Sequence, residues 1–335
     1  MLYSAPVPCI LLALTLSLLA AARSAPSLAN LRQITQEGDS GEPYFSFDGS
    51  RIIFQSKRDG REHDQIYLMN LEGSDQRLVS TGSGRATCSF FFPDGRTYLY
   101  ASTHESQDPP DPPSGYGKGG RYEWSFDKAF DLYVSDLSGH IVRKLTASAG
   151  YDAEATVSPR GDRIVFTSDR DGDLDIYSMN LDGTGVTRLT SEKGYDGGAF
   201  FSPDGKRIIY RASRTDDYRA LQIYVMNADG SSKRQLTHGS GTSFAPYWHP
   251  DGKRIVFCSN MEAPPDNRGN FDLYLMQVDA AAGGRGGAAP VKLTDYPGFD
   301  GFPAFSPDGR KLAFASNRGG KSPYQTSIFI ADFVE

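Results

Sequence analysis

The sequence predicts an all-β protein in which six four-stranded antiparallel units form one β-propeller. Three features support this fold class: a turn of the Pro-Asp-Gly kind occurs six times, an apolar strand follows each turn, and a segment like Asp-Leu-Tyr follows each strand. The turns are spaced by roughly 45 residues, within the range of four-stranded propeller blades. The six turns are Phe47-Asp48-Gly49, Pro93-Asp94-Gly95, Pro159-Arg160-Gly161, Pro203-Asp204-Gly205, Pro250-Asp251-Gly252 and Pro307-Asp308-Gly309.

The copy that starts at residue 201 shows how each unit is built. Its Pro-Asp-Gly turn is followed by Arg-Ile-Ile-Tyr at 207–210, which has the composition of a strand. A third strand is expected at 222–224, and a Gly-containing turn at 227–230 precedes a short fourth strand that ends in Gln-Leu-Thr at 235–237. Such a sheet cannot bury both faces alone, so we expect the units to pack radially around an axis.

The ring is expected to close through its N-terminal segment. The sixth unit reaches Glu335 after only three strands. Residues 30–35, which precede the first unit, end in Arg-Gln-Ile-Thr and so resemble the fourth strands of the other units. We therefore predict that 30–35 completes the sixth blade, with a frayed last blade as the alternative.

The first 22 residues are predicted to be a signal peptide. An apolar stretch at 10–19 is followed by three alanines at 20–22, which is typical of an h-region and a small-residue cleavage site. No Lys or Arg precedes the stretch, so an uncleaved anchor is the second interpretation, although a membrane span needs about 20 residues. We expect an exported protein, periplasmic or secreted, with one propeller domain over 23–335 and no integral membrane span.

Charge and cysteine content narrow the functional classes. The net charge of −6 provides no basic field, so we expect no nucleic-acid partner. Cys88 and Cys258 fall three blades apart, on opposite sides of the predicted axis. Because a disulfide needs Cα atoms within about 7 Å, both are expected to be buried free thiols.

The repeated words "SPDGKRI", "SDRDGDLDIYSMNLDG" and "RLT" resemble the repeats of TolB-type propellers, a family of WD40-like "SPDG" repeats, from residue 30 to the C-terminus. The resemblance implies a six-bladed propeller and a periplasmic or secreted protein. TolB itself belongs to the Tol–Pal envelope complex and carries an α/β domain before its propeller, for which this sequence leaves no room. The fold alone names no function.

Three loops between blades repeat Gly-aromatic-Asp, and their carboxylates are candidate ligand residues. Asp152, Asp196 and Asp300 occupy equivalent positions, and Glu42 and Glu154 are expected near them at the channel mouth. Oxygen ligands around one axis could hold Ca²⁺ or another divalent cation, or attract a basic or hydroxyl-rich ligand. The alternative is that each Asp accepts backbone hydrogen bonds in its own loop.

An arginine follows the second strand at the same offset in four blades. A planar guanidinium beside a carboxylate indicates an ion pair that braces the loops, with ligand recognition as the alternative. The four residues are Arg58, Arg170, Arg214 and Arg318.

Blade two carries a long insertion between residues 103 and 131, with a Pro- and Gly-rich first half. Its aromatic residues, Tyr122 and Trp124 among them, are candidate anchors for a partner, or they pack the insertion onto the blade. His63 and His104, in the loops of blades one and two, could ligate a transition metal or act as acid and base. No catalytic signature accompanies them.

From these features we expect a monomeric, exported binding module for a protein or peptide, with a glycan as a further possibility and no certain cofactor. The alternative is a carbohydrate-active or metal-dependent enzyme, of lyase or hydrolase type, that uses the same funnel.

Overall fold

The protein was analysed as a computed structural model that describes residues 25–107, 115–116, 122–123, 126–215, 220–264, 266–267, 269–279 and 289–335, with the backbone alone at 115–116 and 122–123. These residues form strands and no helix, so none of them provides a helix long and apolar enough to cross a membrane. The predicted signal peptide, residues 1–22, lies outside the described residues.

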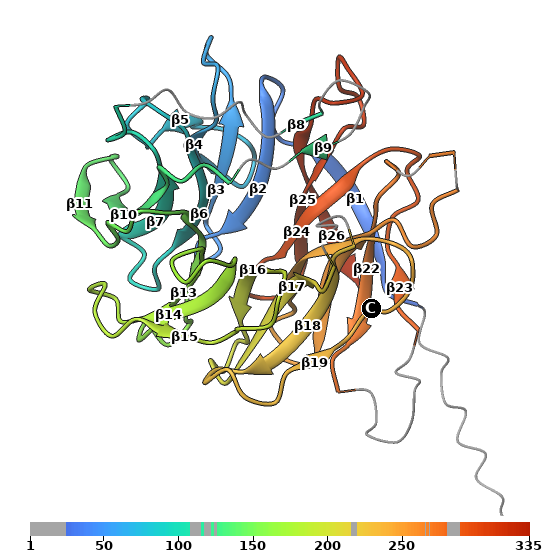
Figure 1. Cartoon of the computed structure of the whole chain (residues 1–335). Helices are drawn as coiled ribbons and strands as arrows, with labels where there is room; N and C mark the ends of the chain where they lie inside the picture. The colour runs from blue at the N-terminus through green and yellow to red at the C-terminus, as the bar shows by residue number, and fades with distance from the viewer. Residues whose placement is uncertain are drawn as a thin grey trace, which may run out of the picture.

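Six four-stranded antiparallel sheets surround one axis, which confirms the predicted propeller (Figure 1). Blades one to three contain β2 (Asp39–Phe45), β3 (Arg51–Lys57), β4 (Gln65–Asn70) and β5 (Arg77–Leu78); β6 (Ala86–Phe91), β7 (Thr97–Ser102), β10 (Asp131–Asp136) and β11 (Ile141–Lys144); and β12 (Asp152–Val157), β13 (Ile164–Ser168), β14 (Asp175–Met179) and β15 (Thr187–Arg188).

The other three blades repeat this order. They contain β16 (Tyr195–Phe201), β17 (Arg207–Ser213), β18 (Gln222–Asn227) and β19 (Arg234–Gln235); β20 (Ser243–Trp248), β21 (Arg254–Ser259), β22 (Asp272–Gln277) and β23 (Val291–Lys292); and β24 (Asp300–Phe305), β25 (Lys311–Ser316), β26 (Ser327–Val334) and β1 (Ser27–Gln33). In the insertion of blade two, β8 (Gly115–Tyr116) and β9 (Tyr122–Glu123) form a separate two-stranded sheet.

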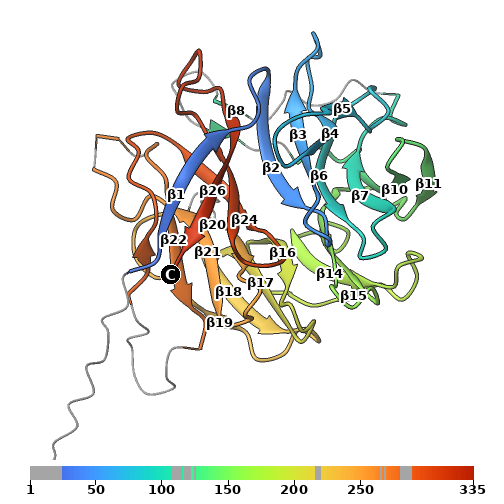
Figure 2. The same cartoon turned by 180° about the vertical axis from the view of Figure 1, so that it is seen from behind.

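The N-terminal strand closes the ring, as predicted. Figure 2 shows the blue strand β1 alongside the red strand β26. Ser27 lies opposite Val334, and Gln33 lies opposite Phe329. The strand begins three residues earlier than predicted, and its register shifts near Asn30, whose side chain donates to Asp332 at 2.7 Å.

The middle strands of the blades are buried on both faces because each sheet packs between two neighbours. All residues of β13 and β14 are buried, with Phe166 and Tyr177 among them. This explains why the second strands read as continuous apolar runs and not as an alternation. Cys88 and Cys258 are free thiols, as predicted, but only Cys258 is buried, whereas Cys88 is partly exposed.

The Thr of the repeated "RLT" word has a structural role, which Ser80 fills in blade one. Its hydroxyl accepts a hydrogen bond from the backbone N–H of a residue in the third strand, at 2.8 to 3.0 Å. Since the third-strand amide is buried, the hydroxyl satisfies a donor that would otherwise be costly. The acceptors in blades one to six are Ser80, Thr146, Thr190, Thr237, Thr294 and Thr35.

In the sixth blade this bond joins the two ends of the chain, from Ile328 N–H to the Thr35 hydroxyl at 2.8 Å. We predict that Thr35→Val lowers the free energy of unfolding by about 1–3 kcal/mol, because it leaves a buried N–H unpaired. Hydrogen exchange should accelerate at the Ile328 amide. Thr190→Val is the matched control and should accelerate exchange at Ile176 instead; unchanged protection of Ile328 in Thr35→Val would contradict the assignment.

Candidate functional site

The strand order gives the propeller two distinct faces. The loop face carries the connections from second to third strands and from one blade to the next. The turn face carries the Pro-Asp-Gly turns. Because first strands begin and second strands end at the loop face, the repeated Asp and Arg residues lie on that side.

In blade three the repeated Asp and Arg form a buried brace. Asp152 lies opposite Ser168 at the start of β12 and is fully buried. Arg170 Nη2 donates to Asp152 Oδ1 at 2.9 Å, and its Nε donates to Ser168 Oγ at 2.9 Å. The Arg170 guanidinium therefore connects its own loop to both β12 and β13, with one donor on a carboxylate and another on a hydroxyl.

The same ion pair occurs in two further blades. Arg214 donates to Asp196 at 2.7 Å, and Arg318 is paired with Asp300. Blade one has Ser40 in place of the Asp, and Arg58 Nη2 donates to its hydroxyl at 3.1 Å. All four guanidinium groups also lie over aromatic rings of their own blades, on Phe54 and Tyr67, on Phe166 and Tyr177, on Tyr224, and on Tyr296, Phe314 and Phe329.

The three repeated carboxylates are held within separate blades. Ser148 donates to the second oxygen of Asp152, whereas Oδ2 of Asp196 is buried without a hydrogen-bond partner. Burial raises the pKa of Asp196 to about 7, although Arg214 lowers it, and burial also raises the pKa of Asp300. Within the described residues, no three His, Cys, Asp or Glu side chains gather as a possible metal site, so Asp152, Asp196 and Asp300 are not brought together around an ion.

A left-handed bulge in the innermost strand of every blade turns one residue toward the axis. The register of the first strand shifts at this residue, and its φ lies between +49° and +57°. All six residues line one cavity on the axis. They are Glu42, Cys88, Glu154, Gly198, Ala245 and Phe302.

The sequence places Glu42 and Glu154 at the channel mouth, and both line the cavity. The prediction missed that they share one repeated position, which has a sequence signal. Each bulge residue stands six positions before the second residue of the turn that follows it, as Glu42 stands before Asp48 and Glu154 before Arg160. Aligning the units on the turn would have identified the six residues that face the channel.

A buried polar network joins blades three and four inside the channel. Arg211 Nη2 donates to Glu154 Oε1 at 2.5 Å, and Arg211 Nε donates to the Tyr195 hydroxyl oxygen at 3.0 Å. The Tyr195 hydroxyl donates to Glu154 Oε2 at 2.7 Å, and Thr167 donates to the same oxygen at 2.8 Å. The hydrogen bonds from Tyr195 and Thr167 to Glu154, and from Arg211 to Tyr195, offset part of the cost of burying this ion pair.

Two glycines of blade four make room for this network. A Cβ on Gly197 would collide with the Glu154 carboxylate and the Tyr195 hydroxyl. A Cβ on Gly198 would lie 2.8 Å from Arg211 Nη1, and the φ of Gly198 is +57°. Blade four therefore contributes no side chain at the bulge because the side chains of blade three and of its own second strand fill that space.

Glu42 lines the same cavity from blade one, next to the Cys88 thiol. Burial raises the pKa of Glu42 to about 7, the Arg211 charge lowers it, and the Glu154 charge raises it further. Burial also raises the pKa of the Cys88 thiol. The channel thus contains the ion pair of Glu154 and Arg211 and, in Glu42, a carboxyl group whose pKa is raised by burial.

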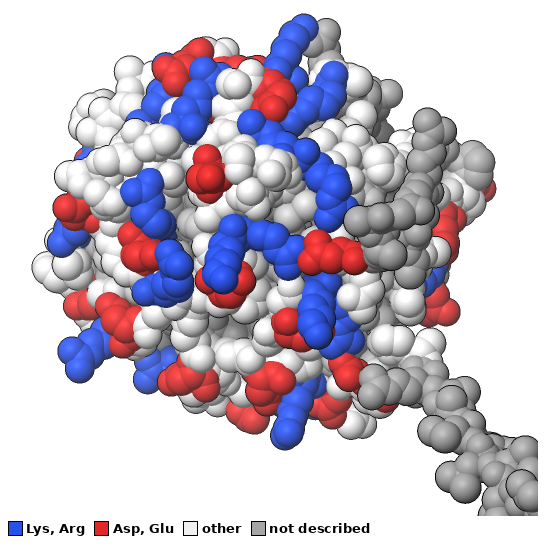
Figure 3. All heavy atoms as spheres, turned by 90° about the horizontal axis from the view of Figure 1, so that it is seen from below, with Lys and Arg blue, Asp and Glu red and all other residues white. Residues whose placement is uncertain are grey.

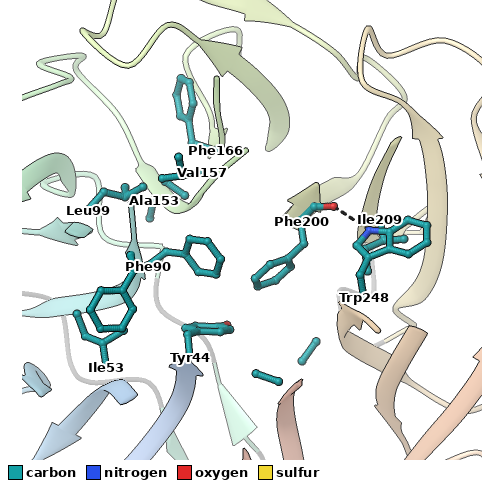
Figure 4. Close-up of a cluster of buried hydrophobic side chains, with 14 of the residues drawn as sticks. Tyr44, Ile53, Phe90, Leu99, Ala153, Val157, Phe166, Phe200, Ile209 and Trp248 are labelled. Atoms are coloured by element: carbon teal, nitrogen blue, oxygen red, sulfur yellow. Dashed lines mark hydrogen bonds between the residues drawn. The ribbon is translucent and has the colours of Figure 1, made fainter. Parts of the chain in front are cut away.

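Aromatic rings fill the axis next to this cavity. Tyr44 from blade one and Phe200 from blade four, on opposite sides of the ring, have centroids 5.5 Å apart. Phe90 packs against the same two rings (Figure 4). Tyr247 also packs against both. In Figure 4 the Trp248 indole N–H donates to the Phe200 carbonyl oxygen at 3.3 Å, which fixes the strand that carries the central ring.

The space left in the channel is small. The cavity measures about 30 Å³. Since one water molecule needs at least about 10–15 Å³ on this measure, the cavity has room for one or two waters and not for a sugar ring or a peptide side chain.

The described base of the blade-two insertion packs over the channel on the loop face. Phe126 lies 5.4 Å from Tyr151 and 5.8 Å from Tyr195, centroid to centroid. Phe130 also contacts Tyr151. The side chains of the predicted anchors Tyr122 and Trp124 lie outside the described residues.

The two candidate histidines have different surroundings. The His104 ring packs 4.5 Å from the Tyr133 ring, and its Nδ1 is 3.0 Å from Ser102 Oγ. Burial lowers the pKa of His104. His63 lines a groove on the loop face of blade one.

Comparison with known proteins identifies relatives of the fold. A family model described as the TolB beta propeller domain matches residues 123–220. A solved structure of a putative TolB from Agrobacterium tumefaciens is 23% identical, with a TM-score of 0.59 over 92% of this chain and 99% of that chain. TolB from Acinetobacter baumannii is 20% identical, with a TM-score of 0.59 over 89% of this chain and 64% of that chain.

An oligogalacturonate lyase from Vibrio parahaemolyticus is also similar, with 15% identity and a TM-score of 0.55 over 93% of this chain and 98% of that chain. Another oligogalacturonate lyase was solved in complex with manganese, and it is 16% identical with a TM-score of 0.53 over 94% of this chain and 99% of that chain. At these identities the similarity concerns the fold. Together with the family-model match, it supports a propeller of the TolB type.

The donors that the structure describes are not arranged as a manganese site. Within the described ranges, His63 and His104 belong to no group of three or more His, Cys, Asp or Glu side chains that could hold a metal ion. The Arg211 guanidinium beside Glu154 also disfavours a cation in the channel.

The channel network predicts a contrast between two equivalent glycines. Gly197→Ala should destabilise the protein by about 1–3 kcal/mol, because the added methyl group displaces Glu154 and Tyr195 in a packed core. Gly41→Ala in blade one is the matched control, since a Cβ there meets nothing within 4 Å. Urea unfolding measures both. Equal effects of the two substitutions would show that the network does not fill the space next to Gly197.

Proposed function

We propose that this chain is an exported, non-catalytic binding module that holds a protein or peptide partner on its loop face. The observation that carries the proposal is the filled channel: its cavity of about 30 Å³ lies beside a packed aromatic cluster. A ligand larger than water must therefore contact the surface of the propeller and not its interior.

The braces support the same proposal. In blades three, four and six a buried carboxylate fixes the arginine that follows the second strand, so the loop face is held in place before a partner arrives. A surface that is already ordered loses less conformational entropy on binding. The braces therefore favour recognition on this face even though their own side chains are committed to the fold.

The mixed charge on one side of the molecule suits selective association and not polyanion binding. On the face drawn in Figure 3, Lys and Arg side chains are interspersed with Asp and Glu, and neither sign forms a continuous patch. The chain carries a net charge of −6. Alternating charges of this kind select a partner of complementary pattern and influence its rate of association.

Export is part of the proposal. The apolar stretch at 10–19 and the small residues that follow it support a signal peptide. The similarity to TolB structures also supports export. We further propose that the propeller acts as a monomer.

The proposal is tested by selecting peptides against the propeller from a random library and locating them by hydrogen exchange. We expect protection in the loops that connect second to third strands and none in the Pro-Asp-Gly turns. Tyr324→Ser should weaken binding about tenfold, because Tyr324 is 49% exposed on the loop face and aromatic residues dominate such interfaces.

Val142→Ser is the matched control, since Val142 is 54% exposed on the outer strand β11 of blade two. It should leave affinity unchanged. Selected peptides that protect the turn face, or a library that yields no binder, would contradict the proposal.

A further inference from the structure

A polar groove lies on the loop face of blade one, away from the channel. It is formed by the connection between β3 and β4 and by the loop that leads into blade two, and its volume is about 370 Å³. This falls within the range of small-ligand sites. The lining residues include Asp59, Arg61, Glu62, His63 and Gln65.

The floor of the groove is rigid. Gln65 is buried, and its side chain donates to the Gly84 carbonyl oxygen at 2.8 Å while accepting from the Ser80 hydroxyl at 2.7 Å and the Gly82 N–H at 3.1 Å. Arg61 Nη1 donates to the Gly82 carbonyl oxygen at 3.0 Å. The side chains and the loop therefore hold one another in a single arrangement.

Glycine is required in the wall of this groove. Gly84 has a φ of +60°, and a Cβ there would lie 2.8 Å from the His104 backbone nitrogen. Gly82 has a φ of +79°, and a Cβ there would lie 3.1 Å from Arg61 Nη1. The bare backbone lets the Arg61 guanidinium lie against the loop.

Two nitrogen atoms of the lining have no hydrogen-bond partner. Arg61 Nε and His63 Nδ1 are both buried and unpaired. A buried donor without an acceptor costs about 1–3 kcal/mol, so each such group in a folded protein calls for an explanation. Arg61 Nε is a donor, and His63 Nδ1 is a donor in one of its two tautomers, so an oxygen acceptor is the kind of partner that the lining lacks.

We propose that the groove binds the carboxylate of an acidic residue of a peptide partner, with Arg61 and His63 as its donors. The inference rests on the proposed function, because it assigns a subsite to the peptide-binding face. A carboxylate is the acceptor that matches a guanidinium best, since the hydrogen bonds are charge-assisted.

The neighbouring carboxylates define the partner further. Asp59 already accepts from the Tyr67 hydroxyl at 2.7 Å, whereas Glu62 is exposed at the rim. The Glu62 charge repels an isolated carboxylate and attracts an ammonium group beside it. The favoured partner segment therefore has an acidic residue next to a basic one.

Four blocked tetrapeptides test this inference by NMR titration of the folded propeller: Gly-Glu-Lys-Gly, Gly-Gln-Lys-Gly, Gly-Glu-Gln-Gly and Gly-Gln-Gln-Gly, each with an acetylated N-terminus and an amidated C-terminus. We expect the Glu-Lys peptide to shift the Gly82 and Gly84 amide signals and to bind about tenfold more tightly than the Gln-Lys peptide. In Arg61→Gln this difference should disappear, and in Glu62→Gln the preference for Lys should disappear.

Arg61→Lys is included because it keeps the charge and lacks Nε, and it should retain only part of the preference for Glu. Thermal unfolding verifies that each variant is folded, so that peptide affinities are compared between folded proteins. Equal affinity for the Glu-Lys and Gln-Lys peptides, an unchanged difference in Arg61→Gln, or no binding of any peptide would overturn the inference.

The two proposals fail in distinguishable ways. If library-selected peptides protect the loop face but the tetrapeptides leave the groove signals unshifted, the groove inference fails and the proposed function stands. If selected peptides protect only the turn face, the proposed function fails, whatever the tetrapeptides do.

Discussion

The left-handed bulge in the innermost strand of each blade is the constraint on which the rest of the structure depends. Five of the six bulge residues are not glycine, so each accepts a backbone conformation that costs an L-residue roughly 1–2 kcal/mol. The packing around the axis compensates for this cost. Because the bulge turns one residue to the channel and sets the direction of those that follow it, Glu154 meets Arg211 and Tyr44 meets Phe200 across the ring.

The buried ion pairs have two roles, one in the filled channel and one at the loop face. The Glu154 and Arg211 pair connects blades three and four in the interior, whereas pairs such as Asp152 and Arg170 order the loop face. Neither type of pair leaves a side chain free to bind a large ligand. Recognition therefore depends on the loops that these pairs hold in place, and the groove beside Arg61 is one such surface.

The repeat made the architecture predictable, including the ring closure and the ion pairs of Arg170, Arg214 and Arg318, because each depends on spacing within one unit. The residues that meet at the axis could not be predicted from the repeat in the same way. Equivalent positions in a ring are related by rotation, so Asp152 and Asp196 repeat the same contact in separate blades and do not meet. The contact between Glu154 and Arg211 crosses two units and requires Gly197 and Gly198, a combination that no repeated word contains.

The account is tested most directly by the reactivity of Cys88, whose thiol lines the channel cavity. Folded protein is treated with an aromatic disulfide reagent, and mass spectrometry follows Cys88 and the buried Cys258 in the same sample. Cys88 is partly exposed and Cys258 is buried. If the axis is filled, the bulky reagent should modify Cys88 far more slowly than it modifies a free cysteine, and Cys258 only at the rate of global unfolding. Rapid modification of Cys88 while Cys258 stays unmodified would show that the channel admits a ligand-sized molecule, and would contradict the account.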